Sequence, residues 1–227
     1  MFVKNPNQLL VFCLGTCLGI TATQVNAATV TSLPGGAGTA PGITYEWLVE
    51  GVSNNDSVNF VRDVGAKSWN EPSNPVGLKG WTHTSNWVAL ELLQPSVLTI
   101  EIARQANVGT AGNSLYPAFS LYSGWDNEGV EDHQFNTLGN TAWADGIDYI
   151  GHEGNAGAAT AISRSFNLPA GLYSIAIGGN PPTDVTGRQG YLAVLSTAPI
   201  PEPAANTGLF VVALGAILRL AQRQGVN

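Results

Sequence analysis

The segment NWVALELLQPSVLTIEI, residues Asn86 to Ile102, decides the fold class. Apolar side chains fill every second position in its two halves, at 88, 90 and 92 and again at 98, 100 and 102. A period of two is typical of a β-strand with one buried face. Gln94 to Ser96 separates the two runs, so the sequence predicts two strands joined as a β-hairpin.

Similar short runs recur along the chain, and no long helical period is found between the two termini. The predicted strands are Ile43 to Val52, Pro117 to Ser123, Thr160 to Leu168, Gly171 to Gly179 and Gly190 to Ser196. Because Gly, Pro and Asn turns separate them, the sequence predicts an all-β domain over 43–198, an antiparallel β-sandwich or jelly roll. The Gly/Pro-rich stretch 28–42 is predicted to be a linker and 66–79 a loop.

The N-terminus has the pattern of a secretory signal peptide. Lys4 precedes an apolar run from Leu9 to Ile20, and small residues end the segment at Ala27. We therefore expect residues 1–27 to be a cleaved signal and the protein to be exported. Both cysteines, Cys13 and Cys17, lie in this segment, so the mature chain has neither a disulfide nor a thiolate.

The region between the two terminal segments is acidic. Residues 28–198 carry six Lys and Arg against fifteen Asp and Glu, a net charge of −9. A surface of this sign repels phosphate backbones, so nucleic acid is excluded as a partner. Cations, neutral glycans and other proteins remain as partners; the alternative is that the acidity only keeps an exported protein soluble.

The C-terminal stretch 199–227 reads as an added segment. Pro201, Glu202 and Pro203 precede the apolar run Gly208 to Leu218, which is predicted to be a hydrophobic helix, and Arg219 and Arg223 follow it. This order resembles the PEP-CTERM sorting signal of Gram-negative bacteria. The resemblance implies an exosortase-type processing enzyme as partner, transient anchoring in the inner membrane, and delivery to the cell surface or a polysaccharide matrix. The alternative is an amphipathic tail without a sorting role.

Two segments resemble hairpins of the bacterial pre-peptidase C-terminal-type sandwiches, which are secreted accessory domains. They are FNLPAGLYSIAIGG, Phe166 to Gly179, and SNWVALELLQPSVLTIEIA, Ser85 to Ala103. The resemblance implies a domain that binds rather than catalyses.

The region Ser123 to Gly157 is the first candidate binding site, because it is long, weakly periodic and rich in acids. Asp126, Asp145 and Asp148 lead a set of oxygen ligands of the kind Ca²⁺ prefers, together with Asn127, Glu128, Glu131 and Asp132. The spacing fits no known calcium loop, and a solvated acidic loop is the alternative.

A second candidate site uses histidine. Trp81-Thr82-His83 resembles the Trp-x-His element of secreted copper-binding proteins from methane-oxidising bacteria. The resemblance implies that Trp81 is a modifiable ring, His83 one copper ligand, and His133 or His152 a second. Imidazole suits copper, and the mature chain offers no cysteine. The alternative is that Trp81 packs against the sandwich and His83 caps a turn.

A third candidate site is for glycans, with Trp69, Trp125 and Trp143 as stacking platforms; burial of these rings is the alternative. Nucleophile-elbow, zinc-protease, phosphate-loop and catalytic-cysteine patterns are all missing from the sequence. We therefore expect a non-enzymatic binding or structural protein of the cell envelope or polysaccharide matrix. The second hypothesis is a secreted protein that binds copper or calcium.

Overall fold

The computed structural model describes residues 27–33, 43–69, 84–126, 146–154, 158–179 and 185–201. The predicted signal peptide up to residue 26 and the tail beyond Pro201, with its expected hydrophobic helix, lie outside these ranges. Within them, a helix of the length and apolarity needed to cross a bilayer is absent.

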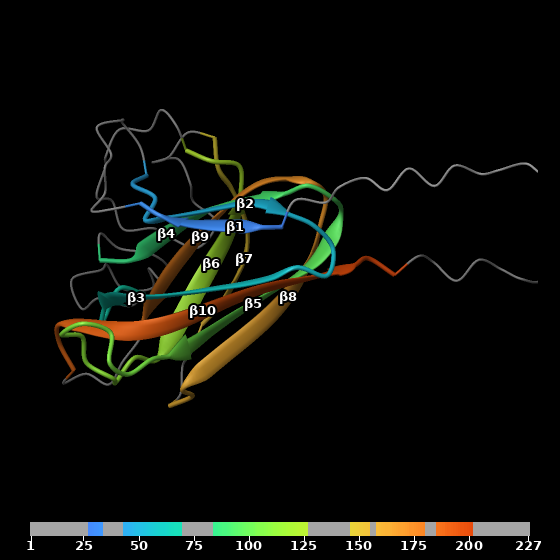
Figure 1. The fold of residues 1–227 in the computed structure, drawn as a ribbon. Coiled ribbons are helices and arrows are strands. Elements are labelled where there is room, and N and C mark those ends of the chain that lie inside the picture. Colours follow the sequence, from blue (N-terminus) through green and yellow to red (C-terminus); the bar gives the residue numbers. More distant parts are fainter. Residues whose placement is uncertain are drawn as a thin grey trace, which may run out of the picture.

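The described residues form two β-sheets packed face to face, as Figure 1 shows. The six-stranded sheet has the order β1-β2-β4-β9-β6-β7, and the four-stranded sheet has the order β3-β10-β5-β8. The all-β sandwich is therefore confirmed. The strands are β1 (Thr29–Ser32), β2 (Trp47–Val52), β3 (Ser57–Gly65), β4 (Asn86–Leu92), β5 (Ser96–Arg104), β6 (Pro117–Ser123), β7 (Asp148–Glu153), β8 (Ala161–Leu168), β9 (Gly171–Gly179) and β10 (Arg188–Pro199).

Both predicted hairpins are wrong. Strand β4 pairs with β2 and β9, whereas β5 pairs with β10 and β8 in the other sheet. The short link after β8 likewise crosses to β9 in the opposite sheet. Alternation shows which face of a strand is buried, but it does not identify the pairing partner. In each case the two consecutive strands lie in opposite sheets. Their buried faces pack against each other across the core instead of forming a hydrogen-bonded pair.

Other expectations also need correction. The sheets are not wholly antiparallel, because β2 and β4 run parallel. The expected linker 28–42 begins with a strand, β1, which adds an edge to the six-stranded sheet beside β2. The long region after Ser123 contains β7, an edge strand in which Gly151 alone is buried. Strands with so few buried positions give little periodic signal in the sequence.

The main core lies between the two sheets. The apolar positions 88, 90 and 92 of β4 and 98, 100 and 102 of β5 all belong to it, as their alternation predicts. A second cluster covers the outer face of the six-stranded sheet and contains Trp87, Tyr122, Ile147 and Ala176. Strand β4 is therefore buried on both faces, although the alternation in its sequence predicts only one.

The core can be tested with a matched pair of leucines at the end of β4. Leu90 is 0% exposed and Leu93 is 48% exposed. We expect Leu90→Ala to lower the free energy of unfolding by about 2 to 5 kcal/mol, because it leaves a cavity between the sheets. Leu93→Ala should change it by less than about 0.5 kcal/mol. Urea unfolding of both variants measures the difference, and equal losses would contradict this description of the core.

Candidate functional site

The structure describes some of the predicted site residues and not others. Trp69, Trp125, Asp126, Asp148, His152 and Pro201 fall within the described ranges. The remaining predicted residues lie outside them: Trp81, His83, Asn127, Glu128, Glu131, Asp132, His133, Trp143, Asp145, Glu202, Pro203, Arg219 and Arg223. Of the three histidines predicted as copper ligands, the described ranges contain His152, and the site is therefore described around this residue.

A bulge in β7 determines where the His152 side chain points. Tyr149 lies opposite Tyr122 of β6 and His152 lies opposite Ser120, with a register shift between them. Residues three apart in a regular strand face opposite sides of the sheet. The extra residue, Ile150, changes this, so Tyr149 and His152 both face outward with Tyr122.

The His152 imidazole is held by its neighbours. Tyr149 Oη and His152 Nδ1 form a hydrogen bond, and the Arg164 guanidinium donates to the His152 carbonyl oxygen. The ring centroid of His152 lies 5.6 Å from that of Trp69. The side chain is half-buried. His152 is thus a positioned imidazole at the sheet edge and not a freely rotating surface group.

Trp69 belongs to a turn that is fixed to the end of β9. Ser68 Oγ donates to the Gly65 carbonyl at 2.7 Å and accepts the Gly179 N–H at 2.8 Å. The Trp69 N–H donates to the Gly179 carbonyl at 2.8 Å. Trp69 is 3% exposed, which leaves no open ring face for a sugar and argues against the predicted stacking role.

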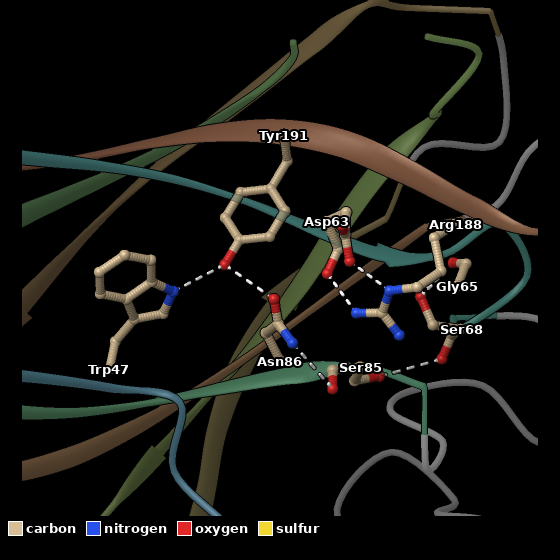
Figure 2. Close-up of polar contacts among 8 residues, drawn as sticks. All are labelled: Trp47, Asp63, Gly65, Ser68, Ser85, Asn86, Arg188 and Tyr191. Carbon is tan, nitrogen blue, oxygen red and sulfur yellow. Dashed lines mark hydrogen bonds and ion pairs between the residues drawn. The ribbon is translucent and has the colours of Figure 1, made fainter. Parts of the chain in front are cut away.

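The first residues of β4 are fixed beside this turn, as Figure 2 shows. Ser85 Oγ donates to the Ser68 carbonyl at 3.3 Å. Tyr191 Oη donates to Asn86 Oδ1 at 3.1 Å and accepts the Trp47 indole N–H at 3.0 Å. Ser85 follows the Trp81 to His83 motif after one residue, Thr84, and its hydrogen bond holds it beside Ser68, the residue before Trp69.

Glu46 binds the same part of β4 from the other side. Its carboxylate accepts the Trp87 N–H at 2.5 Å, and its own N–H donates to the Trp87 carbonyl at 2.9 Å. Burial raises the pKa of Glu46 to about 7, although the Trp87 N–H and the positive charge of Arg62 act in the opposite direction. Burial also raises the pKa of Tyr191 well above its ordinary value. At neutral pH Tyr191 is therefore uncharged, and about half of the Glu46 carboxyl groups hold their proton.

The predicted calcium ligand Asp126 has a structural role in the described part of the chain. It is 4% exposed, its carboxylate accepts the Ile43 N–H at 2.8 Å, and its own N–H donates to Tyr45 Oη at 2.9 Å. The neighbouring Trp125 donates its indole N–H to the Tyr173 carbonyl at 2.9 Å. Among the described residues, no three His, Cys, Asp or Glu side chains gather as metal ligands would.

The arrangement around His152 suits metal ligation more than catalysis. With Nδ1 bonded to Tyr149, Nε2 is the ring nitrogen that would ligate a metal. A hydrogen bond to the other nitrogen is the usual way in which proteins orient a ligating imidazole. Sequence reasoning identified His152 but missed Tyr149 and Arg164, because their contacts depend on the bulge and on the neighbouring edge strand β8.

Comparison with known proteins assigns no family to this chain. No protein-family model matches it, and no curated protein does. Among solved structures it is similar to CorA of Methylomicrobium album BG8, a surface-associated copper-binding protein, at 17% identity and a TM-score of 0.45, over 65% of this chain and 98% of that one.

Two further similarities are weaker. The secreted protein MopE of Methylococcus capsulatus, in which an oxidized tryptophan facilitates copper binding, is 13% identical with a TM-score of 0.37, over 65% of this chain and 85% of that one. A pre-peptidase C-terminal domain of a Bacillus anthracis collagenase is 11% identical with a TM-score of 0.29, over 64% and 90%. At these scores the likenesses do not extend to function.

The raised pKa of Glu46 predicts how stability depends on pH. Between its ordinary value of 4.5 and about 7, the folded state holds the proton more tightly than the unfolded state does. The free energy of unfolding should therefore fall as pH rises through this window. Glu46→Gln keeps an acceptor for the Trp87 N–H and removes this fall, so the variant should gain about 3 kcal/mol over the wild type between about pH 4 and pH 8.

Urea unfolding at the two pH values measures the effect. The exposed Glu50 on β2 gives the matched control, since Glu50→Gln should leave the pH profile of the wild type unchanged. Parallel profiles for Glu46→Gln and wild type would contradict the assignment.

Proposed function

We propose that this protein is an exported, non-enzymatic binding protein whose ligand is a copper ion held by His152 and His83. The observation that carries the proposal is the position of His152, whose imidazole is fixed by Tyr149 and packed beside Trp69. Imidazole nitrogen is a good ligand for copper, and the mature sequence has no thiolate to compete.

Chain geometry supports the pairing of the two histidines. Ser85 is hydrogen-bonded to Ser68, whose neighbour Trp69 touches the His152 ring. His83 is two residues before Ser85, so the two backbone positions are separated by at most about 7 Å. A histidine side chain starting there can extend toward the Trp69 turn. His83 of the sequence motif and His152 of β7 can therefore supply two ligands to one metal ion.

Sorting is the second part of the proposal. Strand β10 ends at Pro199 and the described chain continues to Pro201, the first residue of the Pro-Glu-Pro motif. Ile200 and Pro201 are both exposed, so a processing enzyme has access to the chain at the point where the sandwich ends. We propose that an exosortase-type enzyme acts beyond this point and that the domain is delivered to the cell surface or its polysaccharide matrix.

Metal titration of the purified chain tests the copper proposal. We expect the metal-free wild type to hold Cu(I) against a competing chelator, and His152→Ala or His83→Ala to lose this binding. Tyr149→Phe removes the partner of Nδ1 and should weaken binding by about 10- to 100-fold.

His133→Ala is the matched control, because His133 is the other candidate second ligand. It should bind copper as the wild type does. Loss of binding in His133→Ala together with retention in His152→Ala would overturn the proposed ligand pair, and no binding by the wild type would overturn the function.

The sorting proposal has its own experiment. Changing Pro201, Glu202 and Pro203 together to alanine should leave unprocessed protein in the inner membrane. Fractionation of the cells and the mass of the recovered protein measure this outcome. An unchanged mass and location in the triple variant would show that the motif is not the sorting signal.

A further inference from the structure

Six aromatic rings form a continuous row on the outer face of the six-stranded sheet. They come from three strands, β4, β6 and β7, and from two segments outside the strands that contain Tyr45 and Trp69. Neighbouring ring centroids are separated by 5.6 Å (Trp69 to His152), 6.2 Å (His152 to Tyr149), 5.9 Å (Tyr149 to Tyr122), 5.6 Å (Tyr122 to Trp87) and 6.5 Å (Trp87 to Tyr45).

Small residues on β9 make this row possible. Trp87 on β4 and Tyr122 on β6 are not on neighbouring strands, because β9 lies between them. The outward residues of β9 at this level are Ser174 and Ala176, which lie beside the two rings in the register. Their short side chains let the two large rings meet over the intervening strand. Tyr122 is 0% and Trp87 5% exposed, so the middle of the row excludes water.

Tyr45 and Tyr149 differ in what accepts their phenolic protons. Ser174 Oγ donates to the Gly124 carbonyl at 2.7 Å, so in its 2.7 Å hydrogen bond with Tyr45 Oη the serine accepts. A serine hydroxyl is a very weak base. Tyr149 Oη instead bonds to an imidazole nitrogen, His152 Nδ1, which is a good proton acceptor when neutral. A tyrosine loses an electron easily only when its phenolic proton can leave at the same time.

We propose that the row is a one-electron oxidation site in which Tyr149 is the terminal electron donor and His152 the acceptor of its proton. A one-electron oxidant takes an electron from the row and is reduced. The O–H bond of Tyr149 breaks, its proton forms a bond to His152 Nδ1, and a neutral phenoxyl radical remains on Tyr149 beside an imidazolium. Trp87 and Tyr122 relay the electron when the oxidant reacts at the far end of the row.

This inference concerns the metal-free protein and does not rest on copper binding. The substrates of the oxidation site are one-electron oxidants such as high-valent metal complexes or oxygen-centred radicals. In an exported chain whose mature part has no cysteine, aromatic side chains are the groups that can supply a single electron.

A flash-quench experiment on the purified, chelator-treated full chain tests the proposal. A photoexcited ruthenium polypyridyl complex is oxidised by persulfate, and the resulting Ru(III) takes an electron from the protein. Freezing and electron paramagnetic resonance then report the radical. We expect a tyrosyl spectrum in the wild type and the loss of most of it in Tyr149→Phe. The control Tyr116→Phe changes a tyrosine outside the row, beside Arg104, and should keep the full signal.

His152→Gln separates the proton-acceptor role from a merely structural one. Glutamine can still accept a hydrogen bond from Tyr149 but is a poor base, so the tyrosyl yield should fall while thermal unfolding stays close to the wild type. Trp87→Phe keeps an aromatic ring and should lower the yield by interrupting the relay. A wild-type spectrum in Tyr149→Phe, or an undiminished yield in His152→Gln, would overturn the proposal. A wild-type spectrum in Tyr149→Phe would not bear on the copper proposal, because metal titration tests that proposal separately.

Discussion

The burial of both faces of the six-stranded sheet is the constraint on which the rest of the structure depends. Its inner face packs against the four-stranded sheet, and part of its outer face is covered by residues from two segments, around Tyr45 and Ile147. This second layer requires short side chains on β9, and Ser174 and Ala176 supply them. The aromatic row and the hydrogen bonds of Asp126 with Ile43 and Tyr45 both follow from this arrangement, because each needs a dry outer surface to pack on.

Inside the sandwich, a small polar network specifies how the strands meet. Tyr191 is buried between the sheets, and its hydroxyl joins Trp47 of β2 to Asn86 of β4. A buried hydroxyl without partners would destabilise the fold, so both bonds must form in the native pairing. The network therefore favours the parallel pairing of β2 with β4 over a slipped one. It also fixes the start of β4, where the chain arrives from the Trp81 to His83 motif.

Sequence reasoning predicted the strands with clear alternation and the class of fold, because a buried face leaves a period of two in the residues. It failed where topology depends on something other than periodicity. The links after Leu92 and Leu168 look like hairpin turns, yet both cross between sheets. At the candidate site, the histidine was visible in the sequence. Its partners were not, because the bulge at Ile150 that brings Tyr149 to the same face leaves no mark in the residue pattern.

The proposed metal site and the proposed oxidation site require opposite protonation states of His152 Nδ1. A neutral imidazole carries a single N–H. A metal on Nε2 requires that hydrogen on Nδ1, where it is donated to Tyr149 Oη. The proposed proton transfer instead requires that hydrogen on Nε2, so that Nδ1 accepts from Tyr149. The same bonded pair therefore orients the ligand in the first state and receives the phenolic proton in the second. Because Nδ1 cannot donate and accept at once, we expect metal loading and oxidation of Tyr149 to exclude each other at this site.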